Sequence, residues 1–268
     1  MAYQIVHLGG SRWLKMLFRT SLVFAVALLG ILSCSKSSNP VTTPVYRPVF
    51  SVFHVGQSSQ YQQWTLDSAN GSKILSSLLY VHETIINTNF SANINGQLSL
   101  AYLAIDTTYD GTNTTPIHFD SILYTQIGQT IYYWGLIPHV VFSLFNYPNG
   151  TISLPYKWNK IIDQGNTAGW LTDTTTIALK YSGSTIYPIE TLNGKDIGDT
   201  TFIINGVTYT ADHAQHSGSL NANFASMPLS LDIYMMYSPV VAAKIVIAPS
   251  KLGATSYNGI ERDLVKIN

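Results

Sequence analysis

Hydrophobic and polar positions alternate with a period of two along most of the chain after residue 48. Clear examples are the runs 176–181, 201–210 and 229–236. Successive side chains of a strand point to opposite faces, so this alternation gives each strand one apolar face. The runs are rich in Thr, Tyr, Val and Ile, which favour extended backbone. The pattern predicts an all-β, mainly antiparallel domain with many hairpins.

Asn-Gly dipeptides separate many of these runs. Both central residues of a type I′ turn need a positive φ, which Asn and Gly tolerate better than other residues. The chain has six such dipeptides, and Asp110-Gly111 adds a seventh turn of the same kind. The six begin at Asn70, Asn95, Asn149, Asn193, Asn205 and Asn258. We therefore expect tight turns at these positions.

Two stretches depart from the alternation. Apolar residues of 74–86 fall at helical spacing, although the β-branched and polar run 82–89 favours a strand for the second half. The first half is compatible with either structure. The segment 155–163 begins with Pro and places its apolar residues on one side, so we expect a short helix there. At most one or two short helices are therefore predicted.

Several of the predicted strands are apolar on both faces. The run 131–137 contains three consecutive aromatic residues, and neighbours in a strand point to opposite sides. The runs 138–145 and 237–247 behave similarly. Such strands lie between two layers, or one of their faces lines a cavity. A curved, half-barrel-like sheet and a two-sheet β-sandwich both satisfy this requirement, and the pattern leaves the choice open.

The first 34 residues differ in composition from the rest. Three basic residues lie within 12–19, and the twelve residues 21–32 carry no charge. A spanning helix needs about 20 apolar residues, so this run is too short to cross a bilayer comfortably. A positive segment, a short apolar run and small residues are the parts of a secretory signal peptide. We predict a signal peptide over 1–33, with translation starting at Met1 or Met16.

The end of this segment, Ile31-Leu32-Ser33-Cys34, resembles the lipobox of bacterial lipoproteins. The lipobox has an aliphatic residue three positions before the cysteine and a small residue directly before it. The resemblance implies that Cys34 is diacylglycerylated, becomes the new N-terminus and is N-acylated. Two or more acyl chains give stable anchoring. Ser35, by the same resemblance, implies the outer membrane of a double-membrane bacterium. The expected partner is thus a membrane in the cell envelope, reached through the N-terminal lipid.

The segment 34–47 is polar and contains two prolines, which is typical of a flexible tether. The remainder, 48–268, has no second linker and no repeat, so we predict a single β-rich domain. This domain is similar to β-rich envelope lipoproteins of uncharacterised function. These have a tryptophan-bearing segment near the domain start, here Gln60–Leu66, and a late Tyr-x-Pro strand, here Tyr237–Pro239. A half-barrel like that of lipoprotein carriers is one architecture that this similarity suggests.

Composition narrows the possible functions. Charged residues make up only 10% of the chain and the formal net charge is zero, which argues against nucleic acid as a partner. A single cysteine excludes an intramolecular disulfide and a cysteine-cluster metal site. The sequence has no G-x-S-x-G elbow and no phosphate-binding G-x-x-x-x-G-K-[ST] loop. We therefore predict neither enzymatic activity nor a cofactor.

Two short polar segments contain residue types that bind metal ions. Asp212, His213 and His216 suit Zn²⁺, but in a strand the two histidines point to opposite faces. A metal-dependent hydrolase that uses 212–216 is therefore only an alternative. The segment 106–113 has acids at the first and fifth positions of a Ca²⁺ loop, but it lacks an acid at the third position and the later bidentate Glu. A polar hairpin turn is the simpler interpretation.

Aromatic residues, 12% of the chain, are the remaining candidates for binding. Small-molecule pockets are mostly apolar with few polar anchors, so aromatic side chains suit an apolar or carbohydrate ligand. The candidates are Trp64, Tyr132, Tyr133, Trp134, Trp158 and Trp170. The same residues would equally well build a β core. Our main hypothesis is a lipid-anchored envelope protein that acts by binding or scaffolding. The first alternative is a carrier whose concave apolar face holds an acyl chain or a lipoprotein.

Overall fold

The computed structural model describes residues 47–135, 151–153, 157–181, 184–222 and 225–268. These residues belong to one compact unit, which begins at Arg47. Helical structure in the described residues is limited to one 3-10 turn, η1 (Leu75–Ser77). No helix in this part of the chain has the length and apolar character to cross a membrane. The expected signal peptide, Cys34 and nearly all of the tether lie outside the described residues.

Twelve strands of the described residues form a single antiparallel sheet. They are β1 (Ser58–Leu66), β2 (Leu79–Ile94), β3 (Gln97–Tyr109), β4 (Pro116–Ile127), β5 (Thr130–Trp134), β7 (Trp158–Asp163), β8 (Trp170–Thr176), β11 (Ile189–Ile204), β12 (Val207–Ala222), β13 (Ala225–Tyr237), β14 (Val240–Ile247) and β17 (Gly259–Ile267). Their order across the sheet is β7-β5-β4-β3-β2-β1-β17-β14-β13-β12-β11-β8. Each half of the chain thus forms one half of the sheet, and the pairing of β1 with β17 joins the halves.

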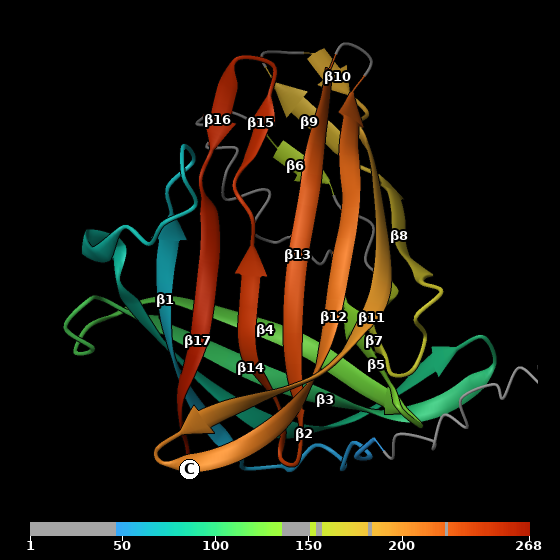
Figure 1. Cartoon of the computed structure of the whole chain (residues 1–268). Coiled ribbons are helices and arrows are strands. Elements are labelled where there is room, and N and C mark those ends of the chain that lie inside the picture. The colour runs from blue at the N-terminus through green and yellow to red at the C-terminus, as the bar shows by residue number, and fades with distance from the viewer. Residues whose placement is uncertain (1–46, 136–150, 154–156, 182–183, 223–224) are drawn as a thin grey trace, which may run out of the picture. The chain divides into compact units, whose positions relative to one another are not determined.

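Two smaller sheets complete the described part of the chain. One contains β6 (Thr151–Ser153), β9 (Ala178–Tyr181) and β10 (Ser184–Ile186), and the other contains β15 (Ser250–Leu252) and β16 (Thr255–Tyr257). In Figure 1 the strands β13, β14 and β17, orange to red, stand steeply across β2, β3 and β4, teal to green. The large sheet is therefore strongly curved, with its apolar interior between the two halves.

Side chains of β8 and of its neighbour β12 contact the backbone of the other edge strand, β7. Trp170 Nε1 donates a hydrogen bond to the Lys160 carbonyl at 3.1 Å, and His216 Nε2 donates to the Ile161 carbonyl at 2.9 Å. A register shift in the β5–β7 pairing leaves Ile161 as an extra residue. These side chains satisfy carbonyl groups that an open sheet edge would otherwise leave unpaired. The large sheet is thus strongly curved and nearly closed. This confirms the half-barrel-like sheet, rather than the β-sandwich, of the two architectures that the sequence allowed.

The turn dipeptides give mixed results. Asn95-Gly96 joins β2 to β3, with φ of 52° at Asn95 and 85° at Gly96. Asn205-Gly206 joins β11 to β12, with φ of 51° at Asn205 and 79° at Gly206. These two hairpins confirm the prediction. The tight turn predicted at Asn193-Gly194 is wrong, since both residues lie inside β11. A Cβ at Gly194 would overlap the Trp170 ring, so this glycine permits close packing. Asn149-Gly150 lies outside the described residues.

The two segments that depart from the alternation, 74–89 and 155–163, both contribute strands to the large sheet. After the 3-10 turn the chain enters β2, so the strand favoured for 82–89 is confirmed. The helix expected over 155–163 is wrong, since its described part forms β7. Asn159, Ile161 and Ile162 are buried, and β7 covers the edge of β5. Pairing with β5 satisfies the backbone of both strands, and this gain outweighs the local helical periodicity.

The main core lies between the two halves of the sheet. Phe50 and Phe53, from the segment before β1, pack inside it, with Phe50 4.6 Å from Tyr237 between ring centroids. Alternate residues of β13, predicted from the sequence to share a face, are buried: Leu229, Leu231, Ile233 and Met235, the last three of them in this core. A second cluster joins Ile204, near the hairpin tip of β11, to residues such as Met236 and Val241.

Candidate functional site

A cavity of about 260 Å³ lies between the two halves of the half-barrel. Strands β4, β5 and β7 supply one wall, and β13, β14 and β17 supply the other. The apolar lining consists of Ile122, Tyr124, Tyr133, Ile161, Leu231, Ile233, Met235, Ala242, Ile245, Ile247 and Ile260. A dry apolar cavity of about 150 Å³ binds benzene. The present cavity therefore has room for a ligand somewhat larger than one aromatic ring.

One end of the cavity is polar. Its lining there consists of Gln63, Asp106, Thr108, His118, Asp120 and Arg262. Arg262 Nη1 donates to Asp106 Oδ2 at 2.8 Å, and Arg262 Nε donates to Gln63 Oε1 at 3.1 Å. Asp106 is only 3% exposed, whereas His118 on β4 is exposed. The polar end thus runs from a buried ion pair to solvent.

Glu83 lies next to this ion pair, directly across the ladder from Asp106. Tyr61 Oη donates to Glu83 Oε1 at 3.2 Å. Burial, together with the negative charge of Asp106, raises the pKa of Glu83 to about 8, although Arg262 acts in the opposite direction. Burial therefore favours the uncharged form of Glu83. Burial alone would lower the pKa of Arg262, but the charge of Asp106 and its hydrogen bond raise it above the ordinary value.

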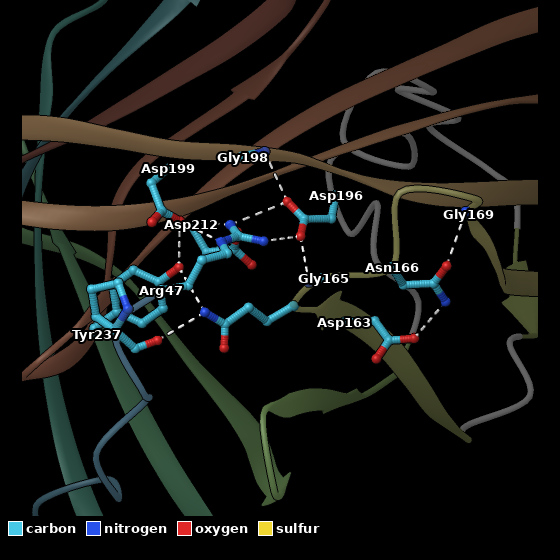
Figure 2. A network of polar contacts seen from close by, with 12 residues as sticks. Arg47, Asp163, Gly165, Asn166, Gly169, Asp196, Gly198, Asp199, Asp212 and Tyr237 are labelled. Atoms are coloured by element: carbon cyan, nitrogen blue, oxygen red, sulfur yellow. Dashed lines mark hydrogen bonds and ion pairs between the residues drawn. The ribbon is translucent and has the colours of Figure 1, made fainter. Parts of the chain in front are cut away.

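A second polar cluster surrounds Arg47 at the start of the folded unit. Figure 2 shows its guanidinium among the carboxylates of Asp196 and Asp199 from β11 and Asp212 from β12. The nearest Asp199 oxygen is 2.6 Å from Arg47 Nη2. Tyr237 Oη also donates to Asp199, and the amide of Gly198 donates to Asp196 at 2.8 Å. The cluster fixes the first described residue of the chain to the central hairpin of the second half.

Two carboxylates of this cluster, Asp196 and Asp212, are completely buried. Burial and then the charge of Asp196 raise the pKa of Asp212 to about 7. Burial also acts to raise the pKa of Asp196. The hydrogen bonds from Arg47 and the Gly165 amide, together with the charge of Arg47, outweigh it, so the pKa of Asp196 lies below the ordinary value. The single guanidinium therefore offsets the burial of Asp196 but not that of Asp212.

The metal-binding candidates do not come together. Asp212 belongs to the Arg47 cluster. His216 Nδ1 lies 3.0 Å from Thr172 Oγ1, and burial lowers the pKa of His216 to about 4, so the ring is neutral. His213 Nε2 points elsewhere, 2.8 Å from Asp232 Oδ1. In the described ranges, no group of three or more His, Cys, Asp or Glu side chains could hold a metal ion.

The acidic loop considered for Ca²⁺ is a hairpin turn between β3 and β4. Asp110 Oδ1 accepts hydrogen bonds from the Thr112 hydroxyl at 2.7 Å and from the amides of Thr112 and Thr114, both at 3.2 Å. These bonds lower the pKa of Asp110. The carboxylate stabilises the turn, as the simpler interpretation predicted.

The aromatic candidates are spread over the sheet rather than gathered at one face. Tyr133 lines the cavity. Tyr132 and Trp134 precede and follow it in β5 and so point away from the cavity, and the Trp134 ring lies 5.2 Å from that of Trp158. Lys73 Nζ lies 3.7 Å above the ring of Trp64, and Trp170 belongs to the junction of β7 with β8. Of these six residues, only Tyr133 belongs to the cavity lining.

Sequence reasoning missed the buried charges of the cavity. Asp106 follows Ala104 at the spacing of one strand face, and Arg262 lies between Ile260 and Leu264 in the same way. An isolated charge on an otherwise apolar strand face is the signal that could have identified both residues. A buried charge needs a partner, so two such positions in different strands suggest a pair.

The described chain is thus an antiparallel half-barrel with an apolar interior cavity. It is similar in fold to the crystal structure of a proposed lipoprotein from Parabacteroides distasonis ATCC 8503, with a TM-score of 0.50 and 7% identity over 83% of this chain and 100% of that chain. A proposed exported protein with a YmcC-like fold from Bacteroides fragilis NCTC 9343 has a TM-score of 0.48 and 7% identity over the same shares. No family model and no curated protein matches the sequence.

Proposed function

We propose that this protein is a lipid-anchored component of the bacterial cell envelope whose half-barrel binds a small apolar ligand. The observation that carries the proposal is the cavity between the two halves. Among the described residues it is a concave, mostly apolar space with a few polar groups at one end, which is the usual form of a small-molecule site. The separation of Asp212, His213 and His216 favours binding over metal-dependent hydrolysis.

The anchoring part of the proposal rests on the sequence of the leader and on Cys34. A protein with the same fold, the one from Parabacteroides distasonis, is itself described as a proposed lipoprotein, and this description supports the assignment. Anchoring at the outer membrane follows from Ser35 by resemblance to other lipoproteins. The tether 34–47 would hold the half-barrel close to the membrane surface.

Replacing Cys34 with alanine is expected to abolish incorporation of radioactive palmitate and to move the protein from the membrane fraction to the soluble fraction. The reason is that two or more acyl chains give stable attachment and their removal leaves none. A Ser35→Ala variant is the matched control and should remain labelled. An unchanged membrane fraction for Cys34→Ala, together with unchanged labelling, would contradict lipid anchoring.

Ligand binding can be tested with naphthalene, an apolar probe without a polar head. Met235 lines the cavity, whereas the neighbouring Met236 belongs to the second apolar cluster. In protein labelled with ¹³C at the methionine methyls, we expect naphthalene to shift the Met235 resonance in a saturable manner and to leave that of Met236 nearly unchanged. Replacing Ile233 with tryptophan should fill the cavity and remove the response.

The control for this variant is the same change at an exposed position. Ile203 is 76% exposed in β11, so Ile203→Trp should bind naphthalene like the unmodified protein. Thermal unfolding of both variants establishes that they are folded, and bound naphthalene should raise the midpoint of the unmodified protein by mass action. Equal responses of Met235 and Met236, or an undiminished response in Ile233→Trp, would exclude the cavity as the binding site.

A further inference from the structure

Four hairpin turns of the large sheet lie at the same rim of the half-barrel. They connect β2 to β3, β4 to β5, β11 to β12 and β13 to β14. Because neighbouring strands of the sheet are antiparallel, these turns, the start of β1 and the end of β17 share one edge. We call this edge the tether rim, since the segment that leads from Arg47 into β1 runs along it. In Figure 1 this segment, in blue, lies at the bottom of the view, and the β15–β16 hairpin lies at the top.

The chain around the tether rim lacks charged side chains over long stretches. No Asp, Glu, Lys or Arg occurs in the segments 48–66, 84–105, 121–134, 200–211 and 233–243, which include all four turns and β1. The charges that border the rim are the Arg47 cluster and Lys266 near the end of β17. At the opposite rim, the connection from β1 to β2 contains Asp67 and Lys73. A surface without charged groups leaves water at a lower cost in free energy.

Three valines of the segment before β1 point to solvent. Val49, Val52 and Val55 are 60%, 62% and 56% exposed. Phe50 and Phe53, which lie between them in the sequence, are buried in the main core. The segment is thus apolar on both of its faces, although one of these faces is exposed.

Hydrogen bonds to two other elements fix this segment. The amide of Ser51 donates to the carbonyl of Tyr237, the last residue of β13, at 2.8 Å. The amide of Phe50 donates to Oε1 of Gln129, in the turn between β4 and β5, at 2.6 Å. The valines are therefore held in place, and a partner that covers them does not have to order the segment first.

The β2–β3 hairpin adds two exposed leucines. Leu98 and Leu100 on β3 are 70% and 45% exposed. They share a strand face with Tyr102, whose ring centroid lies 5.3 Å from that of Phe53. The leucines therefore follow, toward the hairpin turn, the part of β3 that packs against the segment before β1.

Gln126 connects the two leucines with that segment. Its carbonyl accepts a hydrogen bond from Ser99 Oγ, between the leucines, at 2.7 Å, and its side-chain amide donates to the Phe50 carbonyl at 3.5 Å. The three valines and two leucines therefore belong to one apolar surface on the tether rim. Exposed apolar side chains that gather in this way, rather than occur singly, mark interaction sites.

The predicted tether joins the folded unit at this same rim. Twelve residues, 35–46, separate Cys34 from Arg47. A flexible chain of that length has a root-mean-square end-to-end distance of about 20 Å. We infer that the tether rim rests on the lipid bilayer, with its valines and leucines at the boundary between head groups and acyl chains. The inference rests on the lipid anchor of the proposed function, because the anchor holds this rim, rather than the opposite one, near the membrane.

This orientation determines which way the polar end of the cavity faces. Asp106, His118 and Asp120 lie near the β3–β4 hairpin, which belongs to the opposite rim. The polar end therefore faces the aqueous phase and not the bilayer.

Fluorescence quenching in vesicles tests the orientation. Cys34 is the only cysteine of the chain, so a cysteine introduced into the lipidated protein is its sole free thiol. Val52→Cys and Lys251→Cys are each labelled with the fluorophore NBD and reconstituted into phosphatidylcholine vesicles. The vesicles contain a lipid with a nitroxide near the head-group end of its acyl chain.

We expect strong quenching of the label at Val52→Cys, because an interfacial apolar face lies about 5–10 Å into the head-group and acyl boundary. The label at Lys251→Cys, on the β15–β16 hairpin, should be quenched little. Equal quenching of the two labels would overturn the inference. So would a blue shift at Val52→Cys without nitroxide quenching, since that result would show that a protein, such as a second copy of this chain, covers the rim.

A Val52→Asp variant examines the apolar surface itself, with the NBD label at Leu98→Cys. A carboxylate favours water over the head-group boundary, so quenching of this label should fall severalfold. The matched control is Leu75→Asp, which places the same charge at a leucine that is 78% exposed in η1, on the opposite rim. It should leave the quenching unchanged. Undiminished quenching in Val52→Asp would contradict the assignment of the surface.

Thermal unfolding establishes that both aspartate variants are folded, and the comparison of Val52→Cys with Lys251→Cys does not depend on them. Failure of the inference and failure of the proposed anchor are distinguishable. If the unmodified protein incorporates no palmitate, the lipid anchor is wrong. If it incorporates palmitate while the labels at Val52→Cys and Lys251→Cys are quenched equally, the anchor stands and only the orientation is wrong.

Discussion

An Arg47→Met variant is expected to lower the free energy of unfolding by about 3 kcal/mol at neutral pH, because breaking a buried ion pair leaves uncompensated charge. Asp196 and Asp212 are completely buried and both contact this guanidinium. Methionine keeps much of the side-chain volume while removing the charge. Equilibrium unfolding in urea of the purified chain measures the loss. A Lys251→Met variant, at an exposed lysine, should lose much less.

The loss in Arg47→Met should also depend on pH. Without the guanidinium, burial raises the pKa of both Asp196 and Asp212 above the values of the unfolded chain. The native state then binds more protons than the unfolded state between about pH 4 and pH 8, so stability falls as pH rises through this window. The deficit is therefore expected to be smaller at pH 5 than at pH 8. A deficit independent of pH, or equal to that of Lys251→Met, would contradict this account.

Replacing Trp170 with alanine is expected to destabilise the protein by about 3–5 kcal/mol, the usual cost of removing a buried tryptophan. Trp170 is 8% exposed, packs edge-on against the His216 ring at 5.7 Å and hydrogen-bonds the Lys160 carbonyl. The substitution would remove packing from the junction of the two edge strands. It would also leave the carbonyl of Lys160 without this donor.

Urea unfolding of two further variants separates these contributions. Trp170→Phe keeps an aromatic ring but loses the indole N–H, so its loss should be smaller than that of Trp170→Ala. Trp64→Ala removes a tryptophan that is only half-buried and interacts with Lys73, so it should cost less. If Trp170→Ala were no worse than Trp64→Ala, the junction of β7 with β8 would not be important for stability.

The alternation of the sequence identified most of the fold. It identified the strands around 201–210 and 229–236, because a strand with one buried face must alternate whatever its neighbours are. It could not separate Asn205-Gly206, which forms a turn, from Asn193-Gly194, which lies within β11. The difference is the Trp170 ring against Gly194, a contact between residues far apart in the chain. The helix expected over 155–163 failed for a similar reason, since β7 exists through its pairing with β5.

The sequence by itself determined the all-β class, several of the hairpins and the leader that predicts a lipid anchor, because each of these depends on local composition and spacing. Only the tertiary structure decided that the sheet curves into a half-barrel, that Tyr133 rather than its aromatic neighbours faces the cavity, and that Asp106 meets Arg262 there. Those features depend on contacts between β3, β5 and β17. Side-chain spacing along one strand carries no information about which distant strand lies opposite it.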